Sequence, residues 1–385
     1  MARKQKPVKI KRYKNSIGSS TNTVYKVKQV VPVVIGLLLV VLVGFMLGKP
    51  VLNFLSAAGG DDSSSQDISQ SAQIENSSQP EDSSQETPVS SENTSSVTDT
   101  PVTPPAVAKT RVYYYAPAAN LSTEAGIDAV IAQMKAKNAT HLVFDVKNPD
   151  GNVHYVSSNQ YASRLPADVQ IDISALTAKL SANGITPVAR MYTFMDKLIS
   201  NVERSTAVMY QGTDTRWLDS SAALGGKAWA NPASQVMQDY ILSLTDELLS
   251  KGVKEFIFAG FHTPTGYSLD KRDFGATMDQ VLANMKNLIG TLEAKISAKG
   301  GHAAWQIEYS AVSVDGDYAQ YIVHPYQLGA DNIIITAKGA DIDVAQAVSA
   351  LETAQAGDDI SSITLWLTDN VNTDRAKALG NWFAG

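Results

Sequence analysis

Cysteine is absent from all 385 residues of the chain. Without a thiol, the protein forms no disulfide and has neither a cysteine nucleophile nor a cysteine ligand for a metal. Its folded part must therefore be stabilised by a hydrophobic core. The segment 110–385 is long enough to form one.

Sequence motifs of nucleotide and zinc sites are missing as well. There is no G-x-x-x-x-G-K-[ST] phosphate loop, and no glycine-rich loop follows the apolar runs at 111–117 and 140–147. The five histidines show no H-x-x-x-H or H-x-H spacing, which argues against zinc. The segment GYS at 266–268 is not a G-x-S-x-G nucleophile turn. We therefore expect no cofactor and no metal.

Charge is distributed very unevenly at the start of the chain. Residues 1–29 contain nine Lys/Arg and no acid, and residues 30–47 contain no charge at all. Eighteen apolar residues are long enough to cross a bilayer as a helix, and the basic side predicts a cytoplasmic N-terminus with the C-terminal part outside the cell membrane. A cleaved signal peptide is the alternative, but its apolar core is usually shorter. Because the basic tail adjoins such a span, we interpret it as a topology signal and expect no nucleic-acid partner.

Composition divides the rest of the chain into two parts. Residues 48–109 are rich in Ser, Thr, Gln, acids and Pro and poor in aromatic residues, which predicts a disordered linker. Residues 110–385 alternate apolar runs with amphipathic stretches. The predicted strands are 111–117, 140–147, 185–192, 254–261, 303–310, 331–338 and 362–368, and the predicted helices include 122–138, 233–252, 276–297 and 343–355.

Seven or eight strand-helix units with nearly continuous apolar strands predict a parallel sheet covered by helices. An α/β fold of the (β/α)8 TIM-barrel type fits the number of units best, and a doubly wound open sheet is the alternative. In a barrel, the functional residues lie at the C-terminal ends of the strands and in the loops that follow them.

The predicted strand ends carry polar and acidic residues. Asp145 and Glu308 are the candidate catalytic pair, because glycoside hydrolysis uses two carboxylates, one as general acid and one as nucleophile or base. A hard cation such as Ca²⁺ could also bind acids at this mouth. The candidate ligand-binding residues are Lys147, Arg190, Asp196, Trp217, Trp229, His262 and Asp369.

Each of these residues also has a structural interpretation. Asp145 and Lys147 could pair with each other or with Arg190 at the barrel rim. Trp217 and Trp229 could close a loop against the barrel instead of stacking on a sugar. A loop histidine such as His262 often serves only as a hydrogen-bonding group.

Three segments carry a resemblance to a known family. One strand ends in D-x-K followed by a D-G turn, a later strand ends in R-x-x-x-F-x-D, and a W-x-N-P segment opens a helix. The matching residues are Asp145, Lys147, Asp150, Gly151, Arg190, Phe194, Asp196, Trp229, Asn231 and Pro232. Together they resemble the putative glycosyl hydrolase domain found in bacterial surface proteins, over roughly residues 110–330. The resemblance implies a (β/α)8 barrel close to glycosidases and a polysaccharide as the partner.

One motif departs from the family pattern. Where the family typically reads F-D-Y-x-R-F-P, this chain reads Phe258-Ala259-Gly260-Phe261-His262-Thr263-Pro264, so Ala259 replaces an Asp and His262 an Arg. An alanine can neither donate a proton nor attack an anomeric carbon. Two main hypotheses remain: a membrane-anchored hydrolase that acts on cell-wall or extracellular polysaccharide, and a non-catalytic barrel that binds a glycan or protein at the envelope. A third hypothesis is a purely structural spacer anchored in the membrane.

Overall fold

The computed structural model describes residues 111–384, apart from 359 and 370–372. Eight parallel strands close into a barrel in the order β1-β2-β3-β5-β7-β8-β9-β10, with β10 returning to β1. The strands are β1 Val112–Tyr115, β2 His141–Lys147, β3 Thr186–Tyr192, β5 Glu255–Ala259, β7 His302–Glu308, β8 Asn332–Ala337, β9 Ser362–Leu367 and β10 Trp382–Phe383. Closure excludes the open doubly wound sheet and confirms the barrel.

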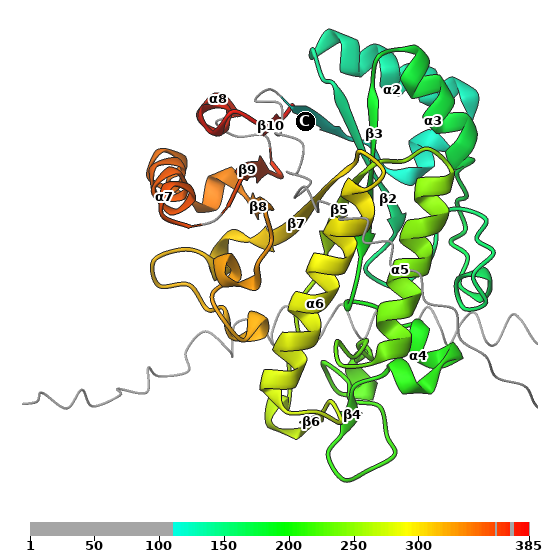
Figure 1. Ribbon diagram of the computed structural model, residues 1–385, viewed down its shortest axis with the longest axis vertical. Helices are drawn as coiled ribbons and strands as arrows, with labels where there is room; N and C mark the ends of the chain where they lie inside the picture. The colour runs from blue at the N-terminus through cyan, green and yellow to red at the C-terminus, as the bar shows by residue number, and fades with distance from the viewer. Residues whose placement is uncertain (1–110, 359, 370–372, 385) are drawn as a thin grey trace, which may run out of the picture. The chain divides into compact units, whose positions relative to one another are not determined.

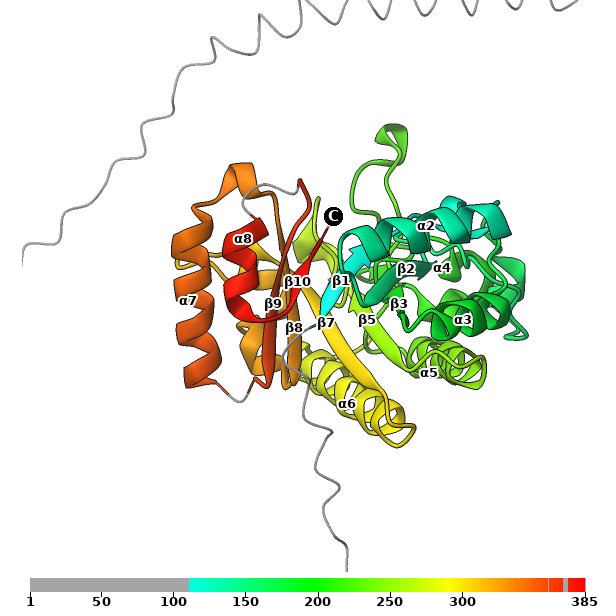
Figure 2. The ribbon, with the colours of Figure 1, turned by 90° about the horizontal axis from the view of Figure 1, so that it is seen from above.

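Helices surround the strands, as the view from above shows (Figure 2). They are α2 Glu124–Ala136, α3 Ile173–Ala182, α5 Gln235–Ser250, α6 Met278–Ser297, α7 Val344–Gly357 and α8 Thr373–Ala376, with the short α4 Ile199–Val202 in the loop after β3. Helices α5 and α6 are the longest and contact each other (Figure 1). Thr277 and Gln280 form a capping box that starts α6, and the Ser234 hydroxyl caps α5. All four helices predicted by residue range are confirmed.

Two connections differ from a regular repeat. Between β7 and β8, all residues are described and the chain forms only the 3-10 turns Tyr309–Ala311, Ala319–Tyr321 and Pro325–Leu328. In the loops after β3 and β5, the two-residue strands β4 Met209–Tyr210 and β6 Arg272–Asp273 pair antiparallel. These segments lie beyond the C-terminal ends of the barrel strands (Figure 1).

The barrel interior is filled by one apolar layer to which each strand contributes a residue. These residues are Tyr113, Val143, Val188, Ile257, Ala304, Ile334, Trp366 and Phe383. Trp366 stacks on Phe383 with ring centroids 4.1 Å apart and an angle of 1° between the planes. The barrel is thus a packed core and not a pore.

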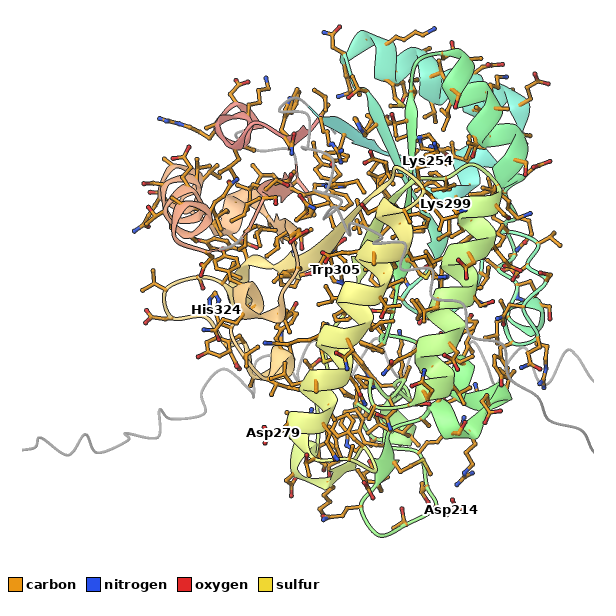
Figure 3. The ribbon with its side chains drawn as sticks, viewed as in Figure 1. Asp214, Lys254, Asp279, Lys299, Trp305 and His324 are labelled. Carbon is orange, nitrogen blue, oxygen red and sulfur yellow. The ribbon has the colours of Figure 1, made fainter. Side chains whose placement is uncertain are left out.

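The two ends of the barrel differ in their residues. In Figure 3, Lys254 and Lys299 lie at the end where the strands begin, whereas Asp214 and Asp279 lie toward the opposite end. At the first end, Arg111 precedes β1 and its Nη1 lies 2.8 Å from Glu255 Oε2 and 2.7 Å from His302 Nδ1. This cluster closes the barrel below its apolar layer.

The predicted cytoplasmic tail (1–29), transmembrane helix (30–47) and linker (48–109) lie outside the described residues. Among the residues that are described, no helix is both long enough and apolar enough to cross a bilayer.

Glu293 on α6 gives the barrel a pH-dependent stability. Burial, with the charge of Asp331, raises its pKa from 4.5 to about 7, although the Asp331 amide donates to it at 3.1 Å. The folded state therefore binds the proton more tightly than the unfolded state, so this contribution is complete below pH 4.5 and is lost as the pH rises to about 7. We expect Glu293→Gln to be more stable than the native protein at pH 8 by roughly 1–2 kcal/mol, with a smaller difference at pH 5.

Urea unfolding at the two pH values measures this difference. Glu352→Gln, on the exposed face of α7, is the matched control and should show no such change. An equal effect of Glu293→Gln at both pH values would contradict the prediction.

Candidate functional site

A cavity of about 460 Å³ opens at the C-terminal ends of β1, β3, β7, β8 and β9. Because alternate residues of a strand face the same side, the cavity is lined by residues that directly follow the apolar layer of the interior. The lining residues are Tyr115, Arg190, Tyr192, Gln306, Glu308, Thr336, Ala337, Lys338, Trp366 and Thr368.

Arg190 forms the floor of the cavity through an ion pair with Asp145. Its Nε and Nη2 donate to the two carboxylate oxygens of Asp145 at 2.6 and 3.0 Å, and the Tyr115 hydroxyl donates to Asp145 at 3.0 Å. Burial lowers the pKa of Arg190, but the hydrogen bonds and charge of Asp145 outweigh it and the net shift is upward. Burial and the Asp145 charge raise the pKa of Tyr115 to about 12. Asp145 is thus held by three donors.

Three aromatic rings surround the Arg190 guanidinium. Its carbon lies 4.7 Å from the centroid of Tyr115, 5.0 Å from that of Trp366 and 5.4 Å from that of Tyr192. Such cation-π contacts fix the guanidinium in place. Trp366 also stacks on Phe383 and is only 7% exposed.

Glu308 is the acid that lines the cavity. It ends β7, and its pKa is raised by burial, an effect that the neighbouring Thr336 hydroxyl opposes. A carboxyl group that stays protonated at higher pH can donate a hydrogen bond or a proton to a ligand. Asp145 does not line the cavity; it is bound to two lining residues, Arg190 and Tyr115, and 13% of its side chain is exposed.

Lys147 and Asp196 pair with each other away from the cavity. Lys147 Nζ lies 2.8 Å from Asp196 Oδ2, and both side chains are fully buried. The register between β2 and β3 shifts between Asp145 and Lys147, so these two residues have different partners although they are two positions apart. The expected pairing of Asp145 with Arg190 is confirmed, whereas the expected pairing of Lys147 with Asp145 is wrong, because Lys147 pairs with Asp196.

This pair also holds the loops above the barrel. Lys147 donates to the Tyr192 carbonyl at 2.6 Å, and Asp196 accepts from the amides of Leu198 and Ile199, both at 2.9 Å. Gly151 has a φ of +100°, and a Cβ at this position would lie 1.9 Å from Asp196 Oδ1. The D-G turn therefore needs a glycine at position 151, because any side chain there would collide with the buried Asp196.

Both tryptophans are buried, and the half-buried His262 packs against one of them. Trp217 is fully buried and donates to the Ser268 carbonyl at 3.0 Å, and Trp229 donates to Asp219 at 3.1 Å. The His262 ring lies 5.4 Å from both Trp229 and Tyr321, and burial lowers its pKa. Of the two interpretations of the tryptophans, the one in which they close loops against the barrel matches their buried positions.

Asp369 fixes the rim of the cavity. Its carboxylate accepts from the amides of Gly339 and Ala340 at 2.8 and 3.0 Å. These amides directly follow Lys338, whose side chain lines the cavity. Asp369 therefore positions the chain next to the cavity and is not itself a lining residue.

The predicted site residues thus separate into two groups. Arg190 and Glu308 line the cavity, with Asp145 behind Arg190. The other predicted residues do not line the cavity, so they are not placed to contact a ligand in it. They are Lys147, Asp196, Trp217, Trp229, His262 and Asp369. The sequence interpretation missed Tyr115, Tyr192, Gln306 and Trp366. The signal for them was the two-residue period that leads from Tyr113 to Tyr115 and from Arg190 to Tyr192.

Ala259 ends β5 and is completely buried. By alternation it faces the same side as Ile257, whose side chain belongs to the interior layer. No carboxylate stands at this position. Among the described residues, no group of three potential metal-ligating side chains occurs.

Comparison with known proteins extends these findings. Residues 113–304 match the model of a family described as a putative glycosyl hydrolase domain. The glycoside hydrolase domain of PgaB (BpsB) from Bordetella bronchiseptica is similar in structure, with a TM-score of 0.53 and 12% identity over 71% of this chain and 93% of that chain. A Flavobacterium johnsoniae chitobiase has a TM-score of 0.46 and 9% identity over 71% and 44%. No curated protein matches the sequence. At such identities the structural likeness establishes the fold alone.

Proposed function

Because residues 113–304 belong to the putative glycosyl hydrolase domain family, we propose that the barrel binds a cell-wall or extracellular polysaccharide in the cavity between Arg190 and Glu308. The observation that carries this proposal is the polar cavity at the C-terminal end of the barrel, where barrel enzymes of this architecture hold their ligands. Its amide, hydroxyl and charged groups can hydrogen-bond to sugar hydroxyls.

Binding without hydrolysis fits the acids at this site better than catalysis does. Hydrolysis needs two carboxylates that flank the scissile bond. Glu308 lines the cavity, but the oxygens of Asp145 already accept three hydrogen bonds, and position 259 is an alanine. We therefore propose that catalysis by the family's usual acid has been lost.

Incubation with purified cell-wall and capsular polysaccharides tests this function. Residues 111–385 contain every strand of the closed barrel and are a suitable fragment. We expect retention on the insoluble glycan without new reducing ends, and about tenfold weaker retention in Glu308→Ala, which removes the polar group from the cavity wall, equivalent to about 1.4 kcal/mol. Glu352→Ala on the exposed face of α7 is the control. Absence of retention on every glycan would contradict the proposal.

Hydrolysis is the second candidate, because the raised pKa of Glu308 suits a general acid. Asp145, charged and oriented by Arg190, would then be the nucleophile or base. Reducing ends that appear with the native protein and disappear in both Glu308→Gln and Asp145→Asn would establish this activity. Thermal unfolding of Asp145→Asn must accompany the assay, because this change also weakens the pair with Arg190.

We also propose that residues 30–47 anchor the protein in the cell membrane, with the barrel outside. The support is the uncharged apolar segment and the basic residues that precede it. Because the chain lacks cysteine, single substitutions can be labelled without background. A membrane-impermeant maleimide should label Ser84→Cys in intact cells, but Ser16→Cys only after permeabilisation. Labelling of both in intact cells, or release of the protein into the medium, would contradict the anchor.

A further inference from the structure

We infer that the cavity selects a sugar that carries a carboxylate, such as a uronic acid residue of an acidic polysaccharide. This inference rests on the proposed glycan binding and names the class of glycan. It follows from the way in which the charges around the cavity are paired.

Lys338 brings a positive charge to the cavity wall that no described residue neutralises. It follows β8, and among the described residues its ammonium group has no hydrogen bond or ion pair. Its backbone is nonetheless fixed, because Asp369 accepts from the two amides that follow it. A lysine held at a cavity wall without an anionic partner can pair with an anion on the ligand.

The other charges at the cavity do not cancel this one. Arg190 is balanced by Asp145 at 2.6 Å. Glu308 is the single acid among the lining residues, and it lies too far from Lys338 to form an ion pair with it. Burial raises the pKa of Glu308, so its carboxyl group is protonated at a higher pH than that of an exposed glutamate, which reduces its repulsion of a bound carboxylate.

The aromatic residues of the cavity offer little surface for stacking on a sugar. Trp366 is only 7% exposed, with Phe383 stacked on it and Arg190 against its ring, and the rings of Tyr115 and Tyr192 contact the same guanidinium. Recognition must therefore rely on polar groups. Arg190 Nη1 has only a long bond of 3.4 Å to Gln306 and keeps a donor for the ligand.

The same charges disfavour a cationic ligand. A protonated amino sugar in the cavity would lie near both Arg190 and Lys338, and its only acidic partner would be Glu308. A carboxylated sugar instead places its negative charge near Lys338 and its hydroxyl groups near Gln306 and Thr368.

Pairs of glycans that differ only in the carboxyl group test this inference. Oligosaccharides from polygalacturonate, alginate and hyaluronan are compared with their carboxyl-reduced counterparts for binding to the full-length protein by calorimetry. We expect at least one native uronate to bind at least tenfold more tightly than its reduced form, with a preference that declines as salt is added. Lys338→Met should remove the preference, and Lys338→Arg should keep it.

Lys254→Met and Lys299→Met are the matched controls, because both lysines lie at the opposite end of the barrel (Figure 3). Equal binding of each uronate and its reduced form would overturn the inference and leave glycan binding intact. A preference that survives in Lys338→Met would also overturn it. If neither these oligosaccharides nor the cell-wall glycans bind, the proposed function itself fails.

Discussion

Replacing Lys147 with methionine should lower the free energy of unfolding by about 3–5 kcal/mol, the usual cost of leaving one member of a buried ion pair without its partner. The Asp196 carboxylate would keep its hydrogen bonds from the amides of Leu198 and Ile199 but lose the Lys147 ammonium group 2.8 Å away. The loop after β3 would lose its connection to β2. Urea unfolding monitored by tryptophan fluorescence measures the change.

Two further variants show whether the ion pair is responsible. Lys197→Met breaks a partly exposed pair with Asp150, which keeps Lys227 as a second partner, and should change stability little. Lys147→Met combined with Asp196→Leu removes both charges and should recover part of the loss, because no buried charge is left unpaired. If Lys147→Met is as stable as Lys197→Met, the assigned role is wrong.

Replacing Arg190 with lysine should weaken glycan retention at least tenfold and lower the free energy of unfolding by about 1–3 kcal/mol. The guanidinium donates to both oxygens of Asp145 while it lies among three aromatic rings, whereas an ammonium group cannot match this planar geometry. Asp145 would lose a donor and the cavity floor would become mobile.

Arg204→Lys is the control for this substitution, because Arg204 pairs with Asp214 on the exposed surface. It should change neither stability nor retention measurably. Retention assays and thermal unfolding on the same preparations separate an effect on binding from unfolding. Full retention by Arg190→Lys would place the glycan elsewhere on the barrel.

The barrel was predictable because its strands are nearly continuous apolar runs. All seven strands expected from the sequence are present, from β1 through β9. The eighth, β10, has only two residues and no periodicity to recognise, yet it closes the barrel by pairing with β1. Its pairing depends on the position of β1 in space, which local sequence does not encode.

The candidate site was predictable only in part. Glu308 and Arg190 were recognised from their positions at strand ends, where function is usual in barrels. The burial of Lys147 could not be recognised from the sequence. It results from a register shift in β2 and from pairing with Asp196, which lies in the loop after another strand. Several residues that carry the family resemblance therefore maintain the loops rather than contact a ligand.

The Arg111 cluster marks where the chain enters the barrel, at the end opposite to the cavity. If residues 30–47 anchor the protein as proposed, the connection through the predicted linker at 48–109 would join the barrel at the end opposite to the cavity. A flexible chain of that length would reach roughly 40 Å, which would confine the barrel to a thin layer and raise the local concentration of its binding site there. Even an individually weak contact with a neighbouring polysaccharide would then be occupied much of the time.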